Sequence, residues 1–154
     1  MKLFLDTNVV LDVLADRKPH AADAAFVLSL VERGDAQGFV GAHTVTTLFY
    51  LLERSLGLRK AKRAIHDVLR LVDVVPVDQD RLLQALAMNW RDFEDAVQAA
   101  CAAKVVVDYF VTRNPSDFSG SDPDVITPAE LAAVLASRER RPSSPEAPDP
   151  GEPA

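Results

Sequence analysis

The chain has 154 residues, 48% of them apolar and 26% charged, which suits a single soluble domain with its own core. Its net charge of −6 argues against a general nucleic-acid coat protein but allows an enzyme with a local basic patch. The lone cysteine excludes an internal disulfide and favours a reducing compartment. No apolar run reaches the roughly 20 residues that span a bilayer, so we expect a cytoplasmic protein without membrane contact.

Short apolar segments alternate with amphipathic ones along most of the chain. Strands are predicted at residues 2–5, 38–42, 72–77, 105–112 and 125–127. Helices are predicted at residues 9–15, 21–35, 44–57, 59–72, 79–88, 91–104 and 127–136, the last with a capping box. The β-branched run VVVDYFVT at 105–112 is expected to form a central strand. This alternation predicts an α/β fold, a three-layer α/β/α sandwich with a mostly parallel central sheet.

Residues 138–154 differ from the rest of the chain in composition. They carry five of the ten prolines and almost no apolar side chains. Such a segment cannot bury enough surface to offset the entropy lost on ordering it. We therefore expect one folded domain over residues 1–137, followed by a disordered, proline-rich tail.

Polar side chains gather where two strands end and where one helix begins, the region in which open α/β sheets bind ligands. They are Asp6, Thr7 and Asn8 after the first strand, Asp92, Glu94 and Asp95 at the start of helix 91–104, and Thr112, Asn114 and Asp117 after the run 105–112. Taken singly, each is explained as an ordinary helix cap or turn residue. Taken together, the carboxylates would repel one another and raise one another's pKa unless a cation lay among them.

Oxygen ligands of this kind favour Mg²⁺ or Mn²⁺ as the cation. Zinc is disfavoured, because the single cysteine has no partner and His20, His43 and His66 lack the spacing of zinc ligands. The chain also lacks the glycine-rich phosphate-binding motifs GxGxxG and GxxxxGK[ST] and the nucleophile motif GxSxG.

Three segments in this order, FLDTNVVLDVL, DFEDAVQAACAAKVVVDYFVTRNPSDF and ITPAEL, resemble the PIN domain family. The resemblance covers residues 2–133 and is closest to the prokaryotic branch that includes ribonuclease toxins of toxin–antitoxin pairs. It implies an α/β/α sandwich, an acidic quartet that binds Mg²⁺ or Mn²⁺, and hydrolysis of phosphodiester bonds in RNA. It also implies a homodimer and, for a toxin, an antitoxin partner.

The family's motifs carry over onto only part of the acidic quartet. Asp6 matches the first acid, Asp95 matches the acid of the second segment, and Asp117 matches a further acid of the following loop. Thr47 and Asn114 stand where the family usually has acids, as in a branch with neutral substitutions. The resemblance thus implies catalytic and metal-binding roles for Asp6, Asp95 and Asp117, with support from Thr7, Asn8, Thr47, Thr112 and Asn114.

The function expected from these residues is metal-dependent RNA hydrolysis, in which a metal-bound water attacks the phosphate. A basic stretch has two interpretations: it binds RNA phosphates, or it is only a solvated helix face. Its residues are Arg54, Arg59, Lys60, Lys62 and Arg63. One alternative is a catalytically weak or inactive PIN-like module that binds RNA or a protein. A phosphatase or phosphotransferase with Asp6 as the nucleophile ranks last, because Asn8 replaces the second aspartate that such enzymes carry.

Overall fold

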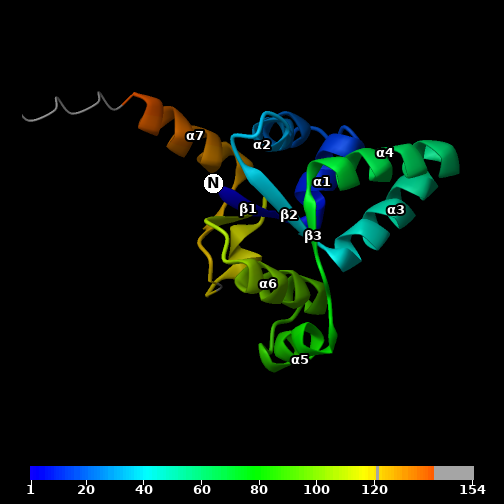
Figure 1. The fold of residues 1–154 in the computed structure, drawn as a ribbon, viewed down its shortest axis with the longest axis vertical. Helices are drawn as coiled ribbons and strands as arrows, with labels where there is room; N and C mark the ends of the chain where they lie inside the picture. The colour runs from blue at the N-terminus through cyan, green and yellow to red at the C-terminus, as the bar shows by residue number, and fades with distance from the viewer. Residues whose placement is uncertain (121, 141–154) are drawn as a thin grey trace, which may run out of the picture.

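The computed structural model describes residues 1–120 and 122–140, and a five-stranded parallel sheet lies at its centre (Figure 1). The strand order is β3-β2-β1-β4-β5, and every pair of neighbours is parallel. The strands are β1 (Lys2–Leu5), β2 (Gln37–Gly41), β3 (Asp73–Val75), β4 (Tyr109–Val111) and β5 (Val125–Ile126). The carboxyl ends of all five strands therefore lie along one edge of the sheet.

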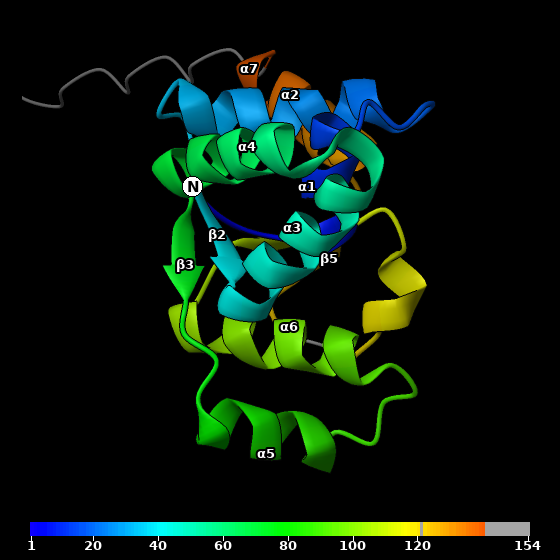
Figure 2. The same ribbon diagram turned by 90° about the vertical axis from the view of Figure 1, so that its right-hand side faces the viewer.

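Helices cover both faces of the sheet, as the alternation of segments predicts (Figure 2). One face carries α1 (Thr7–Leu14), α2 (Ala21–Glu32), α3 (Ala42–Leu56), α4 (Leu58–Leu71) and α7 (Pro128–Glu139). The other face carries α6 (Phe93–Val105), and α5 (Gln79–Ala87) packs on the outer side of α6. The three-layer α/β/α sandwich and its parallel sheet are confirmed.

The central strand shows how the two faces divide the core. Leu3, Phe4 and Leu5 are all fully buried, because β1 is covered on both sides. Leu3 and Leu5 join the core beneath α1, α2, α3, α4 and α7, whereas Phe4 joins the core beneath α6. Burying each of these side chains contributes about 1.5–3 kcal/mol to folding. The carboxyl end of β1, where the chain enters α1, therefore lies in the middle of the molecule.

The prediction of a strand over residues 105–112 is wrong for its first half. Helix α6 continues to Val105, and Val106 ends it in the left-handed conformation with a φ of 51°. Only Tyr109–Val111 forms β4, between β1 and β5. The alanine-rich helix and its packing against the sheet outweigh the strand preference of three consecutive valines.

The remaining boundaries agree with the predictions to within a few residues. The capping box of α7 is present, because the Thr127 hydroxyl accepts from the Glu130 N–H and the Glu130 carboxylate accepts from the Thr127 N–H. Helix α7 runs to Glu139, and residues 141–154 of the predicted tail lie outside the described residues. No helix in the described ranges is both long and apolar enough to cross a membrane.

A substitution at the end of α6 tests the strain at Val106, whose side chain is 79% exposed. A left-handed conformation costs a non-glycine residue roughly 1–2 kcal/mol, and glycine adopts it without this penalty. Val106→Gly is therefore expected to raise the free energy of unfolding by about 1 kcal/mol, measured by urea denaturation. Val105→Gly, one residue earlier in the helix, is the control and should lower it; a fall for both variants would contradict the prediction.

Candidate active site

The side chain of Asp6 lies buried at the carboxyl end of β1 and is 3% exposed. Its two oxygens accept hydrogen bonds from Gln98 Nε2 at 3.0 Å and from Thr112 Oγ1 at 2.8 Å. Asp6 is also the N-cap of α1, and its carboxylate accepts from the N–H of Asn8. Burial raises the pKa of Asp6, although the bonds from Gln98 and Thr112 oppose that rise. Asp6 is thus a helix cap and, at the same time, a buried carboxylate at the strand tip.

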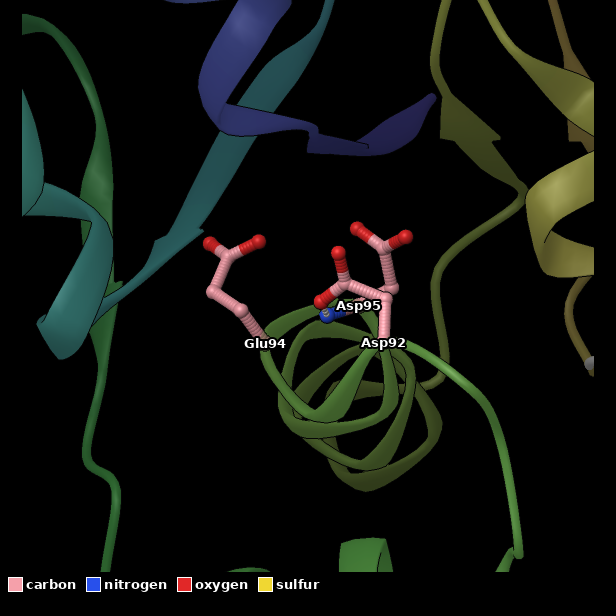
Figure 3. A group of neighbouring side chains, drawn as sticks. All are labelled: Asp92, Glu94 and Asp95. Atoms are coloured by element: carbon pink, nitrogen blue, oxygen red, sulfur yellow. Dashed lines mark hydrogen bonds between the residues drawn. The ribbon is translucent and has the colours of Figure 1, made fainter.

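A second group of carboxylates comes from the first turn of α6. Asp92 is the N-cap of this helix and accepts from the N–H of Asp95 at 3.2 Å. Oxygens of Asp92, Glu94 and Asp95 lie within 4.8 Å of one another. Figure 3 shows the three side chains pointing from the start of α6 toward the junction of β1 and α1. An aspartate cap and acids in the first turn suit the positive end of a helix, which explains why the sequence begins α6 here.

The pKa of Asp95 is raised from its ordinary value of 3.8 to about 7. Burial is the largest cause, and the negative charges of Asp92, Asp6, Glu94 and Asp117 add to it. Four carboxylates thus act on Asp95, and we call the five together the acidic cluster. A divalent cation bound among these oxygens would remove the repulsion, so the donor atoms fit Mg²⁺ or Mn²⁺.

Glu94, to which the sequence gave no separate role, and Gln98, which the sequence did not single out, both belong to this site. Glu94 accepts from Thr7 Oγ1 at 3.1 Å and from Gln98 Nε2 at 3.2 Å. Gln98 is fully buried, and its amide group donates to Asp6 as well as to Glu94. One signal for Gln98 was in the sequence: it is a lone polar residue in the alanine- and valine-rich stretch AVQAACAA. Because a buried amide needs partners, Gln98 ties the two groups of acids together.

His43, at the start of α3, also contacts the acidic cluster. Its Nε2 atom lies 3.2 Å from Glu94 Oε1. The imidazole packs against Gly41 at the end of β2, where an added Cβ would come within 2.6 Å of the ring. A glycine is therefore needed at position 41 for His43 to take this place beside Glu94.

On α3, the threonine that reaches the site through hydrogen bonds is Thr44, one turn before the expected Thr47. Thr44 is fully buried, and its Oγ1 lies 3.0 Å from Thr7 Oγ1. Thr47 is half-buried, and no hydrogen bond joins it to a carboxylate of the acidic cluster in the described ranges. Thr7 itself links α1 to both α3 and α6, through Thr44 and Glu94.

The loop after β4 supplies the remaining expected residues. Thr112 is fully buried and holds Asp6, while the N–H of Asn114 donates to Thr112 Oγ1 at 3.2 Å. Asp117 lies in the short 3₁₀ helix η1 (Pro115–Phe118) and is exposed. A cavity of about 550 Å³ opens beside these residues, and it is lined by Trp90, Arg91, Asp92, Asp95, Ser116, Asp117 and Ser119. Asp95 and Asp117 thus face a common space large enough for a ligand.

Two sets of expected residues lie farther from the cavity. Asn8 is turned toward Arg17, whose Nη1 donates to Asn8 Oδ1 at 3.4 Å. The basic side chains are exposed on the α3–α4 hairpin, which projects from the sheet in Figure 1: Arg54, Arg59, Lys60, Lys62 and Arg63. Arg54 packs over the ring of Tyr50 and donates to its hydroxyl at 2.7 Å. None of these basic residues lines the cavity.

A comparison with family models matches residues 2–116, three quarters of the chain, to the PIN domain. This range includes Asp6 and the three acids at the start of α6. The chain belongs to the PIN domain family. The resemblance inferred from the sequence is confirmed. A comparison with curated proteins finds no significant match.

Solved structures with this fold include several toxin–antitoxin proteins. A toxin–antitoxin complex from Klebsiella pneumoniae is 22% identical and has a TM-score of 0.62, with 82% of this chain and 97% of that chain covered. VapC20 of Mycobacterium tuberculosis, a sarcin–ricin-loop-cleaving toxin, is 20% identical with a TM-score of 0.63, covering 77% of this PIN domain protein and 95% of that chain. VapBC-1 of Haemophilus influenzae is 17% identical with a TM-score of 0.63, covering 84% and 99%. At identities this low, the similarity establishes a shared fold alone.

The raised pKa of Asp95 makes the stability of the metal-free protein depend on pH. Between pH 3.8 and about 7 the folded protein holds a proton on Asp95 that the unfolded chain has released. The free energy of unfolding should therefore fall as the pH rises through this window and level off above it. Asp95→Asn should flatten this dependence and, after allowance for solvent screening, add on the order of 1 kcal/mol near pH 8.

Urea denaturation in EDTA across this pH range measures the effect. Asp80→Asn is a matched control, because Asp80 is an exposed acid in the first turn of α5, outside the acidic cluster. A pH dependence that is the same in wild type and Asp95→Asn would show that Asp95 does not titrate in this way.

Proposed function

We propose that this PIN domain protein is a metal-dependent endoribonuclease. The observation that supports this most directly is that Asp95 and Asp117 line one cavity of a PIN fold, while Asp6, Asp92 and Glu94 lie close enough to Asp95 to raise its pKa. A bound Mg²⁺ or Mn²⁺ would supply an activated water and would neutralise the charge that develops on the phosphate. No side-chain nucleophile is required for hydrolysis by this route.

The chain's own residues take separate parts in this proposal. Asp6 and Asp95 would bind the metal directly, and Asp117 would bind it directly or through a water. Thr112 and Gln98 would hold Asp6 in position, since outer hydrogen bonds orient metal ligands. Asn114, exposed beside Asp117, would hold a metal-bound water through its amide oxygen.

Glu94 lies near the start of α3, the helix in which Thr47 stands where the family usually has an acid. Its carboxylate extends from α6 to within hydrogen-bond reach of Thr7 and lies beside His43 at the start of α3. We propose that Glu94 supplies, from α6, the negative charge that Thr47 does not provide from α3. The site would then keep enough charge for a divalent cation despite the two neutral substitutions.

Partners are also part of the proposal. Structures similar to this one include complexes of toxins with antitoxins, such as VapBC2 of Rickettsia felis bound to a fragment of promoter DNA. We propose that this chain is the toxin of such a pair, acts on RNA in the cytoplasm, and forms a homodimer. A small neighbouring protein that copurifies with the chain and suppresses its RNA cleavage would support the pairing.

The exposed basic residues of α3 and α4 would bind RNA phosphates outside the cavity.

RNA cleavage by the purified protein tests the proposed activity. Cleavage of single-stranded RNA is expected with Mn²⁺ or Mg²⁺ and is expected to stop in EDTA. Asp6→Asn and Asp95→Asn should each lower the rate by about 100-fold or more, because each removes a charged ligand from the metal.

Asp80→Asn is again the control and should keep the wild-type rate. Cleavage that survives EDTA or both active-site substitutions would come from a contaminant and would contradict the proposal. Binding of metal and RNA without any cleavage would instead support the RNA-binding module.

A further inference from the structure

Trp90 and Arg91 line the cavity beside Asp92, Asp95 and Asp117. They lie in the turn between α5 and α6, directly before the cap of α6. Trp90 is the only tryptophan of the chain. The acidic cluster accounts for the carboxylates of this cavity, but it gives no reason for a large aromatic side chain and a cation beside them.

The indole of Trp90 packs against the ring of Phe118, which supports it on one side. It meets the ring of Phe118 edge to face, with centroids 5.9 Å apart and planes at 79°. Phe118 is 1% exposed and packs on Phe110 with centroids 4.3 Å apart. Trp90 itself is only half-buried, so part of this well-supported ring remains open to the cavity. A rigid aromatic surface of this kind suits a planar ligand.

Arg91 adds a positive charge to the same wall. Its side chain is exposed, and within the described ranges it forms no salt bridge with the neighbouring carboxylates. A guanidinium group that is not paired with a carboxylate is free to bind a phosphate, which it can hold with two parallel hydrogen bonds.

We infer that Trp90 and Arg91 form a subsite for the nucleotide next to the bond that is cut. The base stacks on the indole of Trp90, and its phosphate pairs with Arg91. A base inside a duplex is already stacked on its neighbours and cannot reach a side chain in this way, so the subsite selects an unpaired nucleotide. This inference rests on the proposed ribonuclease activity and adds a specificity-determining residue to it.

The single tryptophan gives a direct test. Short single-stranded RNA is titrated into the protein with Ca²⁺ in place of Mn²⁺, and the emission of Trp90 is followed. Stacking should quench this emission as the RNA binds, whereas a duplex of the same sequence should bind more weakly and quench less. Anisotropy of a fluorescein-labelled RNA reports binding independently of the tryptophan.

Three variants separate stacking from packing. Trp90→Leu keeps an apolar contact with Phe118 and should weaken RNA binding by about tenfold, while Trp90→Phe keeps a stacking ring and should stay close to wild type. Arg91→Gln should weaken binding and reduce its dependence on salt, because one phosphate contact is lost. Leu83→Ala, which truncates an exposed apolar side chain on α5 outside the cavity, is the control. Mn²⁺ affinity should be unchanged in both Trp90 variants and in the control.

Several results would overturn the subsite. They are RNA binding without quenching, equal losses for Trp90→Leu and Trp90→Phe, and duplex binding as tight as that of the single strand. Each of these can occur in a protein that cleaves RNA and needs metal, so each contradicts the subsite while the proposed ribonuclease stands. A wild-type protein that neither binds nor cleaves RNA would remove both.

Discussion

Repulsion among carboxylates at one edge of the sheet is the constraint on which the rest of this site depends. Parallel strands bring the end of β1 and the loop after β4 to the same edge, and α6 begins there on the opposite face from α1. Asp6, at the tip of the central strand, cannot move away because its carboxylate is buried and held by Gln98 and Thr112. Folding therefore forces negative charges together, at a cost that a divalent cation would relieve.

Hydrogen bonds determine how closely the acids approach. Gln98 donates to both Asp6 and Glu94 through one amide nitrogen, so it holds two carboxylates at a shared donor. Thr7 performs a similar task between α1, α3 and α6. These neutral side chains carry no charge of their own and do not compete with a cation. They stabilise an arrangement that the charges alone would not adopt.

The sequence was sufficient to predict the fold and the position of Asp6 directly after the first strand. The apolar segment before Asp6, the alternation of strands and helices, and the capping box of Thr127 all depend on local patterns of a few residues. The end of α6 was not predictable in this way, because three valines favour a strand locally and only packing against the sheet decides where the helix ends. A local pattern is informative as long as tertiary contacts agree with it.

The details of the candidate site depend on the direction in which each side chain points. Two of the acids in Asp92, Glu94 and Asp95 are adjacent in the chain, and the sequence cannot tell which one points toward α3. The structure turns Glu94 toward Thr7 and His43, and it brings Thr44 rather than Thr47 into contact with Thr7. The lone glutamine in the alanine-rich stretch AVQAACAA was a usable signal for Gln98, since an amide in a buried helix must find partners inside the protein.

Thermal unfolding with and without Mn²⁺ tests the central claim most directly, namely that the acidic cluster is a cation site. Near pH 8 Asp95 is mostly ionised, because its pKa is about 7. Mn²⁺ should then raise the melting temperature above its value in EDTA, and the rise should shrink near pH 5, where Asp95 is protonated, and in Asp6→Asn. A melting temperature near pH 8 that Mn²⁺ leaves unchanged, or raises equally in Asp6→Asn, would contradict the account.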